Sequence, residues 1–221
     1  MVRVVERARL VAGVDRIVVA TDSGAVIDAL APSGVHSVLT SARHESGTDR
    51  VAEVARMPAF GDFDPIVNLQ GDEPFVPVAA VEGAIARVLA GDDLGTAAAP
   101  LDPELRHDPA RVKVVCDRGG RALYFSRAAI PAVRDAADEA TTRWWQHIGV
   151  YAYRRSALLA LAALPPTDLE RAERLEQLRA LDARFTVGVA LLDAPAPAGI
   201  DTPDDLAAAE ARWRELAEVS R

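Results

Sequence analysis

The sequence predicts an α/β protein in which helices flank a central sheet. Two observations lead to this fold class. Helices and strands alternate along the first half of the chain, and a short apolar strand near its middle ends at once in polar, acidic residues. Alternation is typical of open α/β sheets, whose strands bind ligands at their carboxyl ends. At 221 residues, the chain is long enough for a single domain of this kind.

The first half of the chain starts on a helix rather than on a strand. Apolar residues at helical spacing predict a helix over residues 2–12. A strand over 16–20, a helix over 24–31 and a strand over 35–39 follow. This order is that of a doubly wound sheet without its first strand.

Composition excludes several classes of protein. The net charge of −8 and pI near 5.1 argue against a nucleic-acid partner, because phosphates are contacted by clustered Lys and Arg. Cys116 is the single cysteine, which excludes a disulfide framework and favours a cytoplasmic location. No apolar run is long enough to span a membrane, so we expect no membrane association.

The loop after residue 39 leads into a helix that begins at about Gly47. Ser46, Gly47 and Thr48 stand at this helix start, and Arg50 lies on its first turn. Free backbone N–H groups at such a start hold a phosphate or are simply capped by the serine. The residues alone favour capping.

The stretch Pro65–Pro74, PIVNLQGDEP, joins a buried strand to an acidic loop. Gln70, Asp72 and Glu73 follow the strand directly, where an open sheet binds its ligands. Carboxylates there suit Mg²⁺ that carries substrate phosphates. An acidic turn before the next helix explains the same residues equally well.

The second half begins with extended stretches and a hairpin and ends in helices. Arg118, Gly119 and Gly120 mark the hairpin turn, and a polar excursion over 134–144 follows it. The remaining predicted elements are a strand over 147–153, helices over 154–164 and 168–182, a strand over 185–192, and a final helix capped by Asp201 or Thr202.

Two groups of polar residues are candidates for a site. Asp72 and Asp201 would converge on Mg²⁺ if their loops reach the same edge of the sheet, although the periodicity alone favours Asp201 as a helix cap. His147, Tyr151 and Tyr153 share one face of a strand, where they bind a polyhydroxylated ligand or are three satisfied, partly buried groups. The sequence has no zinc spacing, nucleophile elbow, Walker A loop or dinucleotide fingerprint. The residues therefore indicate a magnesium-dependent enzyme with a phosphorylated ligand.

Six stretches, in register from about residue 2 to about residue 215, resemble the 3-deoxy-manno-octulosonate cytidylyltransferases, or CMP-Kdo synthetases. They are TSARHESGTDRVAEVA, VNLQGDEPFV, RVKVVCDRGGRALYFSRAAIP, HIGVYAYRR, ERAERLEQLRAL and GIDTPDDL. The resemblance implies transfer of CMP from CTP to the eight-carbon acid sugar Kdo, with release of pyrophosphate. It also implies one nucleotidyltransferase domain over 1–221, related to the glycosyltransferase-A fold. Its sheet would be mixed and mostly parallel, and a β-hairpin extension at about 111–150 would form a homodimer.

The resemblance also assigns roles to residues. Asp72 and Asp201 would be the catalytic carboxylates that bind Mg²⁺. The nucleotide side would consist of Ser46, Gly47, Thr48 and Arg50. The Kdo side would consist of Gln70, Arg127, His147, Tyr151, Glu176 and Gln177.

One departure from the family pattern is at the start of the chain. The family begins with a strand and a basic loop that wraps CTP, whereas Met1 falls where the following helix should begin. We expect this chain to be a shortened version of a longer product. Two alternatives remain open at this point. One is a cytidylyltransferase for a related acid sugar, of amino-Kdo or sialic type, because Trp144 and Trp145 precede His147. The other is a sugar-binding homologue without catalysis.

Overall fold

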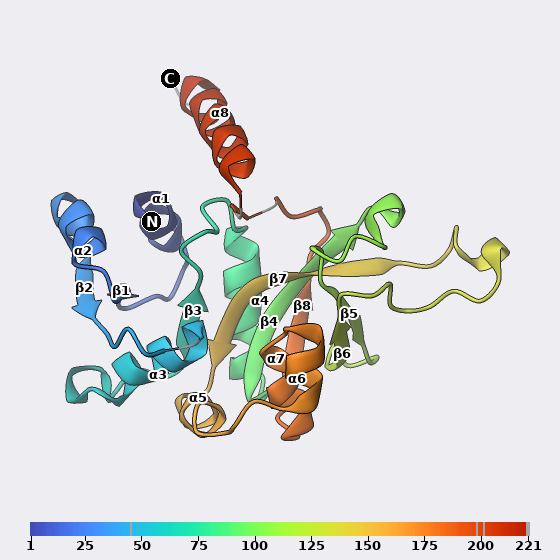
Figure 1. Ribbon diagram of the computed structural model, residues 1–221, viewed down its shortest axis with the longest axis horizontal. Helices are drawn as coiled ribbons and strands as arrows, with labels where there is room; N and C mark the ends of the chain where they lie inside the picture. Colours follow the sequence, from blue (N-terminus) through green and yellow to red (C-terminus); the bar gives the residue numbers. More distant parts are fainter. Residues whose placement is uncertain (45, 198, 201, 220–221) are drawn as a thin grey trace.

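A six-stranded mixed sheet forms the centre of the computed structural model, which describes residues 1–44, 46–197, 199–200 and 202–219 (Figure 1). Its strands are β3 (Ile66–Leu69), β4 (Leu94–Leu101), β5 (Lys113–Cys116), β6 (Ala122–Ser126), β7 (Trp144–Tyr153) and β8 (Val187–Leu191). β7 pairs antiparallel with β3, β4 and β5. β8 adds parallel to β4, and β6 adds antiparallel to β5. The predicted α/β class with a mixed sheet is confirmed, but the expected mostly parallel pairing is not what the larger sheet shows, because β4–β8 is its one parallel pair among the described strands.

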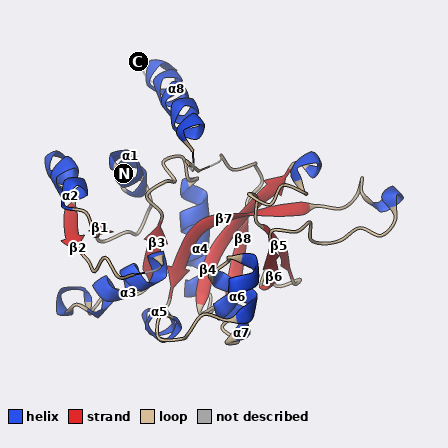
Figure 2. Cartoon of the chain, viewed as in Figure 1, coloured by secondary structure: helices blue, strands red, loops and turns tan. Residues whose placement is uncertain are grey.

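Helices cover both faces of this sheet, as Figure 2 shows. α4 (Val78–Leu89) packs on one face, where its small residues meet Ile148 and Val150 of β7. α3 (Gly47–Arg56) and α5 (Arg155–Leu161) pack on the opposite face. The alternation of side chains along β7 thus gives each helix layer its own apolar surface.

The first part of the chain forms a second, smaller sheet. α1 (Val2–Ala8) precedes β1 (Val18–Thr21), α2 (Gly24–Leu30) and β2 (His36–Leu39), and β1 pairs with β2 in parallel. Within the described residues, β1 pairs with no strand of the larger sheet.

Two cavities of about 490 and 480 Å³ lie between β1 and β3. Val18 and Ala20 line both of them on the β1 side, and Val67 lines both on the β3 side. The expectation that a central strand is absent from this chain stays a prediction.

One predicted helix is in fact two. The pattern over 168–182 predicts a single helix, but the structure has α6 (Asp168–Glu173) and α7 (Gln177–Asp182). Arg174 ends α6 because it adopts a left-handed backbone conformation, with φ of 55°. Arg127 donates hydrogen bonds to the carbonyl that ends α6 (2.8 Å) and to that of Arg174 (3.4 Å). Tertiary hydrogen bonds thus override the local helical pattern.

The polar excursion between β6 and β7 projects away from the sheet (Figure 1). At its base, the Trp144 ring nitrogen donates to the carbonyl of Pro131 at 3.2 Å. Arg106 binds both carboxylate oxygens of Glu139, at 3.0 and 3.1 Å. The predicted hairpin extension therefore divides into β5 and β6, which lie in the sheet, and this projecting segment. Its role in a dimer stays a prediction.

The last helix, α8 (Pro203–Val219), also extends from the body of the molecule (Figure 1). Trp213 packs on Phe75, with ring centroids 5.7 Å apart, and the Arg3 guanidinium lies 4.3 Å from the Trp213 ring centroid. Single-turn 3-10 helices occupy Ala31–Ser33, Pro58–Phe60, Pro103–Leu105 and Ala136–Asp138. None of the described helices combines the length and the apolar character that crossing a membrane requires.

A buried ion pair joins α6 to α7. Arg179 donates to both carboxylate oxygens of Glu170, at 2.8 and 2.6 Å, and the two side chains are only 6% and 13% exposed. Burial opposes the charge on Glu170, but hydrogen bonds from Arg179 and Thr167 outweigh it and lower the pKa of this carboxyl. The pair fixes the relative position of the two short helices.

Replacing Arg179 by methionine should leave Glu170 charged and buried without its partner. Loss of one member of a buried ion pair costs about 3–5 kcal/mol, so we expect the free energy of unfolding in urea to fall by that amount. The control is Arg171→Met, which removes an exposed pair with Asp168 and should cost less than about 1 kcal/mol. Equal losses in the two variants would contradict this account.

Candidate active site

A cavity of about 650 Å³ lies beside β7. Its walls come from the loop after β3, the turn before β5, β7 itself and the turn between α6 and α7. The predicted residues that line it are Thr48, Gln70, Asp72, Arg127, His147, Tyr151, Glu176 and Gln177. Most of the predicted site is therefore brought together in one place, although its residues come from distant parts of the sequence.

One end of this cavity is acidic. Asp72, Glu73 and Asp205 line it there. The backbone N–H of Ile200 donates to the carbonyl of Asp72 at 3.0 Å, so the chain before position 201 lies beside the loop after β3. Asp201, predicted as the second metal-binding carboxylate, lies outside the described residues.

The carboxylates at this end match the oxygen ligands that Mg²⁺ prefers. Asp72 is exposed at the end of β3 and makes no hydrogen bond through its carboxylate to the described part of the chain. Among the described residues, no three Asp, Glu, His or Cys side chains gather closely enough to hold an ion by themselves. Mg²⁺ commonly binds through one or two carboxylates plus substrate phosphates, so this donor set suits it.

Three arginines line the same cavity: Arg111, Arg127 and Arg174. Arg111 lies 3.6 Å from Asp108 and donates to the side-chain oxygen of Gln146 at 2.9 Å. The cavity thus has carboxylates from one set of loops and guanidinium groups from another. A ligand with a negative charge at one end has a preferred orientation in such a field.

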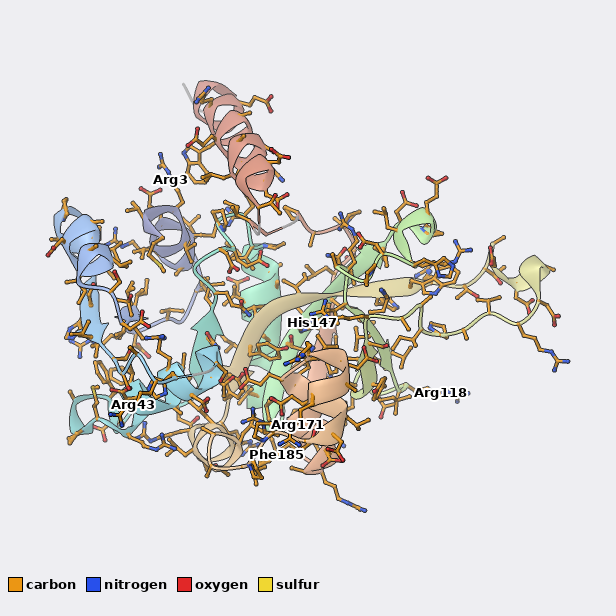
Figure 3. The ribbon with its side chains drawn as sticks, in the orientation of Figure 1. Arg3, Arg43, Arg118, His147, Arg171 and Phe185 are labelled. Carbon is orange, nitrogen blue, oxygen red and sulfur yellow. The ribbon has the colours of Figure 1, made fainter. Side chains whose placement is uncertain are left out.

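The middle of the cavity is formed by β7, whose His147 is marked in Figure 3. The His147 ring lies 5.4 Å from that of Tyr151, which lies 5.9 Å from that of Tyr153. These three side chains were predicted to share a strand face, and the structure confirms it. Burial raises the pKa of both tyrosines, so they stay neutral hydrogen-bonding groups.

Thr96 of β4 orients the His147 ring. Its hydroxyl lies 2.9 Å from Nε2 of His147 and 2.7 Å from the carbonyl of Val150. Because the carbonyl can only accept, the hydroxyl donates to it and accepts from Nε2–H. Nδ1 then carries the lone pair. Burial lowers the pKa of His147 to about 3, so the ring is neutral at pH 7.

Glu176 lies between the two predicted substrate sides. Its carboxylate accepts a hydrogen bond from the Ser46 hydroxyl at 3.0 Å. The same hydroxyl accepts from the backbone N–H of Asp49 at 3.1 Å, which confirms Ser46 as the cap of α3. Burial raises the pKa of Glu176, although hydrogen bonds from Thr48 and Ser46 oppose the shift.

The cavity of about 490 Å³ adjoins the first one. Gly47, Thr48 and Arg50 at the start of α3 line it, as do residues of α1 and β1. Arg50 donates to the Thr40 hydroxyl (2.6 Å) and binds Asp22 (3.0 Å), both just beyond the ends of the two short strands. The residues that line both cavities are Thr48, Gln70, Asp72, Tyr151 and Glu176.

Several side chains that line the cavity of about 650 Å³ make no hydrogen bond to the described part of the chain. They include the amides of Gln70 and Gln177 and the hydroxyl of Tyr151. Tyr151 and Gln177 are only 9% and 7% exposed as whole residues, but in the described part of the chain their polar atoms are not among the fully buried side-chain atoms without a partner, so they face the cavity. Their polar atoms are therefore available to a bound ligand.

Known proteins are similar to this chain in sequence and in fold. A sequence model of the family described as cytidylyltransferase matches residues 1–187. The 3-deoxy-manno-octulosonate cytidylyltransferase of Gemmatimonas aurantiaca is 49% identical over 219 residues, which cover 98% of this chain and 84% of that protein. This chain belongs to the 3-deoxy-manno-octulosonate cytidylyltransferase family. The enzyme of the same name from Xanthomonas oryzae is 48% identical and covers 95% of this chain and 84% of its own length.

One solved structure agrees with membership of the 3-deoxy-manno-octulosonate cytidylyltransferases. A CMP:2-keto-3-deoxy-manno-octonic acid synthetase complexed with CTP superposes with a TM-score of 0.88 at 37% identity, over 96% of this chain and 86% of that one. A 4-diphosphocytidyl-2C-methyl-D-erythritol synthase superposes with a TM-score of 0.58 over 94% of this chain and 86% of its own. At 14% identity, that second likeness shows a shared fold alone.

The sequence patterns missed several residues of this cytidylyltransferase cavity. Thr96 lies in an alanine-rich strand and gave no signal, because its role depends on its register with β7. Arg111 and Arg174 lie inside motifs that were quoted, but neither stands out among the many arginines of the chain. Their position beside the cavity follows from turns that no local pattern specifies.

The depressed pKa of His147 predicts a specific pH dependence of stability. Between pH 6.5, the ordinary histidine value, and pH 3, the unfolded chain binds a proton at His147 that the native chain does not. Stability should therefore fall as pH falls through this window. The variant His147→Gln should lose less stability than the wild type between pH 7 and pH 4, measured as the melting temperature.

The control for this pH series is His107→Gln, which removes an exposed histidine. It should keep the wild-type dependence of melting temperature on pH. If His147→Gln also kept that dependence, His147 would not be the neutral, buried group described here.

Proposed function

We propose that this chain transfers CMP from CTP to Kdo and releases pyrophosphate. The observation that carries the proposal is that two cavities share one wall, which contains Asp72. CTP would occupy the side of Gly47, Thr48 and Arg50, and Kdo the cavity of about 650 Å³. The two substrates would then meet beside Asp72. Nucleotidyl transfer requires the two reacting groups to be held close together in this way.

The larger cavity suits an acid sugar in size, charge and polarity. Its acidic end, with a bound cation, would face the reacting hydroxyl, and Arg111 and Arg174 would face the sugar carboxylate. Gln70, Tyr151 and Gln177 offer donors and acceptors to hydroxyl groups. Nδ1 of the neutral His147 ring accepts a hydrogen bond from one hydroxyl, since Thr96 already occupies Nε2.

Mg²⁺ is the cofactor that we propose for this site. Asp72 would hold it, and Asp201 is proposed as the second carboxylate on the basis of the sequence motif. When bound, the ion supplies positive charge to the phosphates of CTP. The residues of the chain supply binding and orientation, with no covalent intermediate. The anomeric oxygen of the sugar would form a bond to the α-phosphorus while the bond to pyrophosphate breaks, and the hydroxyl proton would pass to water.

We also propose that the chain acts as a homodimer in the cytoplasm. The supporting observation for the dimer is the segment before β7, which projects from the sheet and offers its surface to a second copy (Figure 1). The supporting observation for the compartment is that Cys116 is unpaired. Burial raises its pKa to about 11, so the thiol is protonated and unreactive at neutral pH.

Pyrophosphate release from CTP, Mg²⁺ and Kdo tests the proposed function directly. We expect release to require all three and to fall by roughly a hundredfold or more in Asp72→Ala, which removes the carboxylate at the shared wall. Asp168→Asn is the control, because Asp168 is a fully exposed acid on α6, and it should match the wild type.

Two outcomes would contradict this proposal. One is full activity in Asp72→Ala. The other is release at the same rate when Kdo is replaced by an amino-Kdo or a sialic acid, which would assign the chain to a different acid sugar. Omission of Mg²⁺ in the same assay tests the cofactor separately.

A further inference from the structure

Arg127 stands at the end of β6, and all three nitrogen atoms of its guanidinium are bound to the backbone. Nε donates to the carbonyl of Glu173 at 2.8 Å, and Nη1 donates to that of Pro109 at 2.9 Å. Nη2 makes a longer contact with the carbonyl of Arg174, at 3.4 Å. A guanidinium that is used in this way holds protein segments together and has few donors left for a ligand.

Glu173 completes this connection from the opposite side. Its carboxylate accepts from the Ser126 hydroxyl at 2.6 Å and from the backbone N–H of Arg127 at 2.9 Å. The two side chains therefore bind each other's backbone, in a reciprocal clamp between the end of β6 and the end of α6. We use "the β6–α6 clamp" for Arg127, Glu173 and Ser126.

Lys113 fixes the β6 side of the clamp. This lysine is completely buried, and its ammonium group donates to the carbonyl of Arg127 at 2.5 Å. It also donates to the carbonyls of Asp108 and Arg111, at 2.9 and 2.5 Å. The turn before β5 and the end of β6 are thus tied to a single buried charge, which leaves the clamp little freedom to move.

The α6 side of the clamp leads directly into the cavity. Arg174 adopts the left-handed conformation, which non-glycine residues seldom adopt unless surrounding contacts hold them there. Two residues later come Glu176 and Gln177, which line the cavity at the start of α7. The hydrogen bonds from Arg127 to the carbonyls of residues 173 and 174 hold this turn, together with the Glu170–Arg179 pair and the bond from the Leu175 N–H to the Glu170 carbonyl.

We propose that Arg127 and Glu173 are positioning residues for the acid sugar, which act through the turn that carries Glu176 and Gln177. This inference rests on the proposed function and deepens it. It replaces the expectation that Arg127 contacts the anionic sugar directly. On this account, loss of the clamp releases Arg174 from its left-handed conformation and displaces the amide of Gln177 from the cavity.

The test measures binding of two ligands, Kdo and its carboxamide, in which an uncharged amide replaces the carboxylate. Dissociation constants come from calorimetric titration with CTP present and Mg²⁺ omitted. In Arg127→Met we expect binding of both ligands to weaken by the same factor, about tenfold or more, because the displaced turn serves the sugar hydroxyls. If only Kdo binding weakens, Arg127 contacts the carboxylate and the proposal is wrong.

Two further variants still test the proposal if Arg127→Met fails to fold. Arg127→Lys retains the positive charge but lacks the planar guanidinium that reaches three carbonyls. It should therefore weaken the binding of both ligands as much as Arg127→Met does. Glu173→Ala leaves the guanidinium in place and should weaken the binding of both ligands by the same factor. Wild-type affinity in either variant would overturn the proposal.

A double-mutant cycle and a control complete the design. Arg127→Lys combined with Gln177→Ala should weaken Kdo binding no more than the stronger single change, because both act through one turn. If the double variant instead lost affinity by the product of the two single losses, the proposal would be overturned. Arg118→Met, at the exposed tip of the β5–β6 turn, should bind as the wild type does (Figure 3). Failure of the unchanged chain to bind Kdo would instead overturn the proposed function, and this inference with it.

Discussion

The structure depends on the pairing of β7 with its three partner strands. This ten-residue strand carries His147 and Tyr151 on one face and Ile148 and Val150 on the other. The first face lines the cavity, and the second is the surface on which α4 packs. A shift of one residue in the register would exchange the two faces, so core packing also fixes the site. The hydrogen bond between the Thr96 hydroxyl and His147 also favours this register, because it forms only in the observed pairing of β7 with β4.

Local patterns predicted most elements and several cavity residues, because helical spacing, strand alternation and caps are properties of neighbouring residues, whereas Arg127, Glu176 and Gln177 were predicted from the family resemblance alone. The capping role of Ser46 and the shared face of His147 and Tyr151 are of this kind. The break at Arg174 is different, since its cause is a set of donors from a strand that lies far away in the sequence. The same reason explains why Lys113 was not singled out. Its buried charge is satisfied by three carbonyls that only the folded chain assembles.

Charge is distributed unevenly along the cavity. Carboxylates lie at one end and arginines line the cavity as well, whereas the groups on β7 are held neutral by burial. Because the groups on β7 carry no charge, the carboxylates and guanidinium groups of the surrounding loops set the field along the cavity. Hydroxyl groups of a ligand then meet neutral donors and acceptors, and its ionic groups meet charges of opposite sign. Specificity for an acidic, polyhydroxylated molecule follows from this arrangement more than from any single contact.

The division into two sheets affects how cooperatively the chain unfolds. In the described residues no ladder hydrogen bonds connect β1 to the larger sheet, and cavities lie where such a connection would be. The segment from β1 to β2 is therefore held by helix packing and by side-chain bonds such as that between Arg50 and Asp22. Its backbone amides should exchange with solvent through local opening, at a lower free energy than those of β7. The nucleotide side of the proposed site thus belongs to a part of the chain that opens locally at a lower free energy than the part that forms the sugar side.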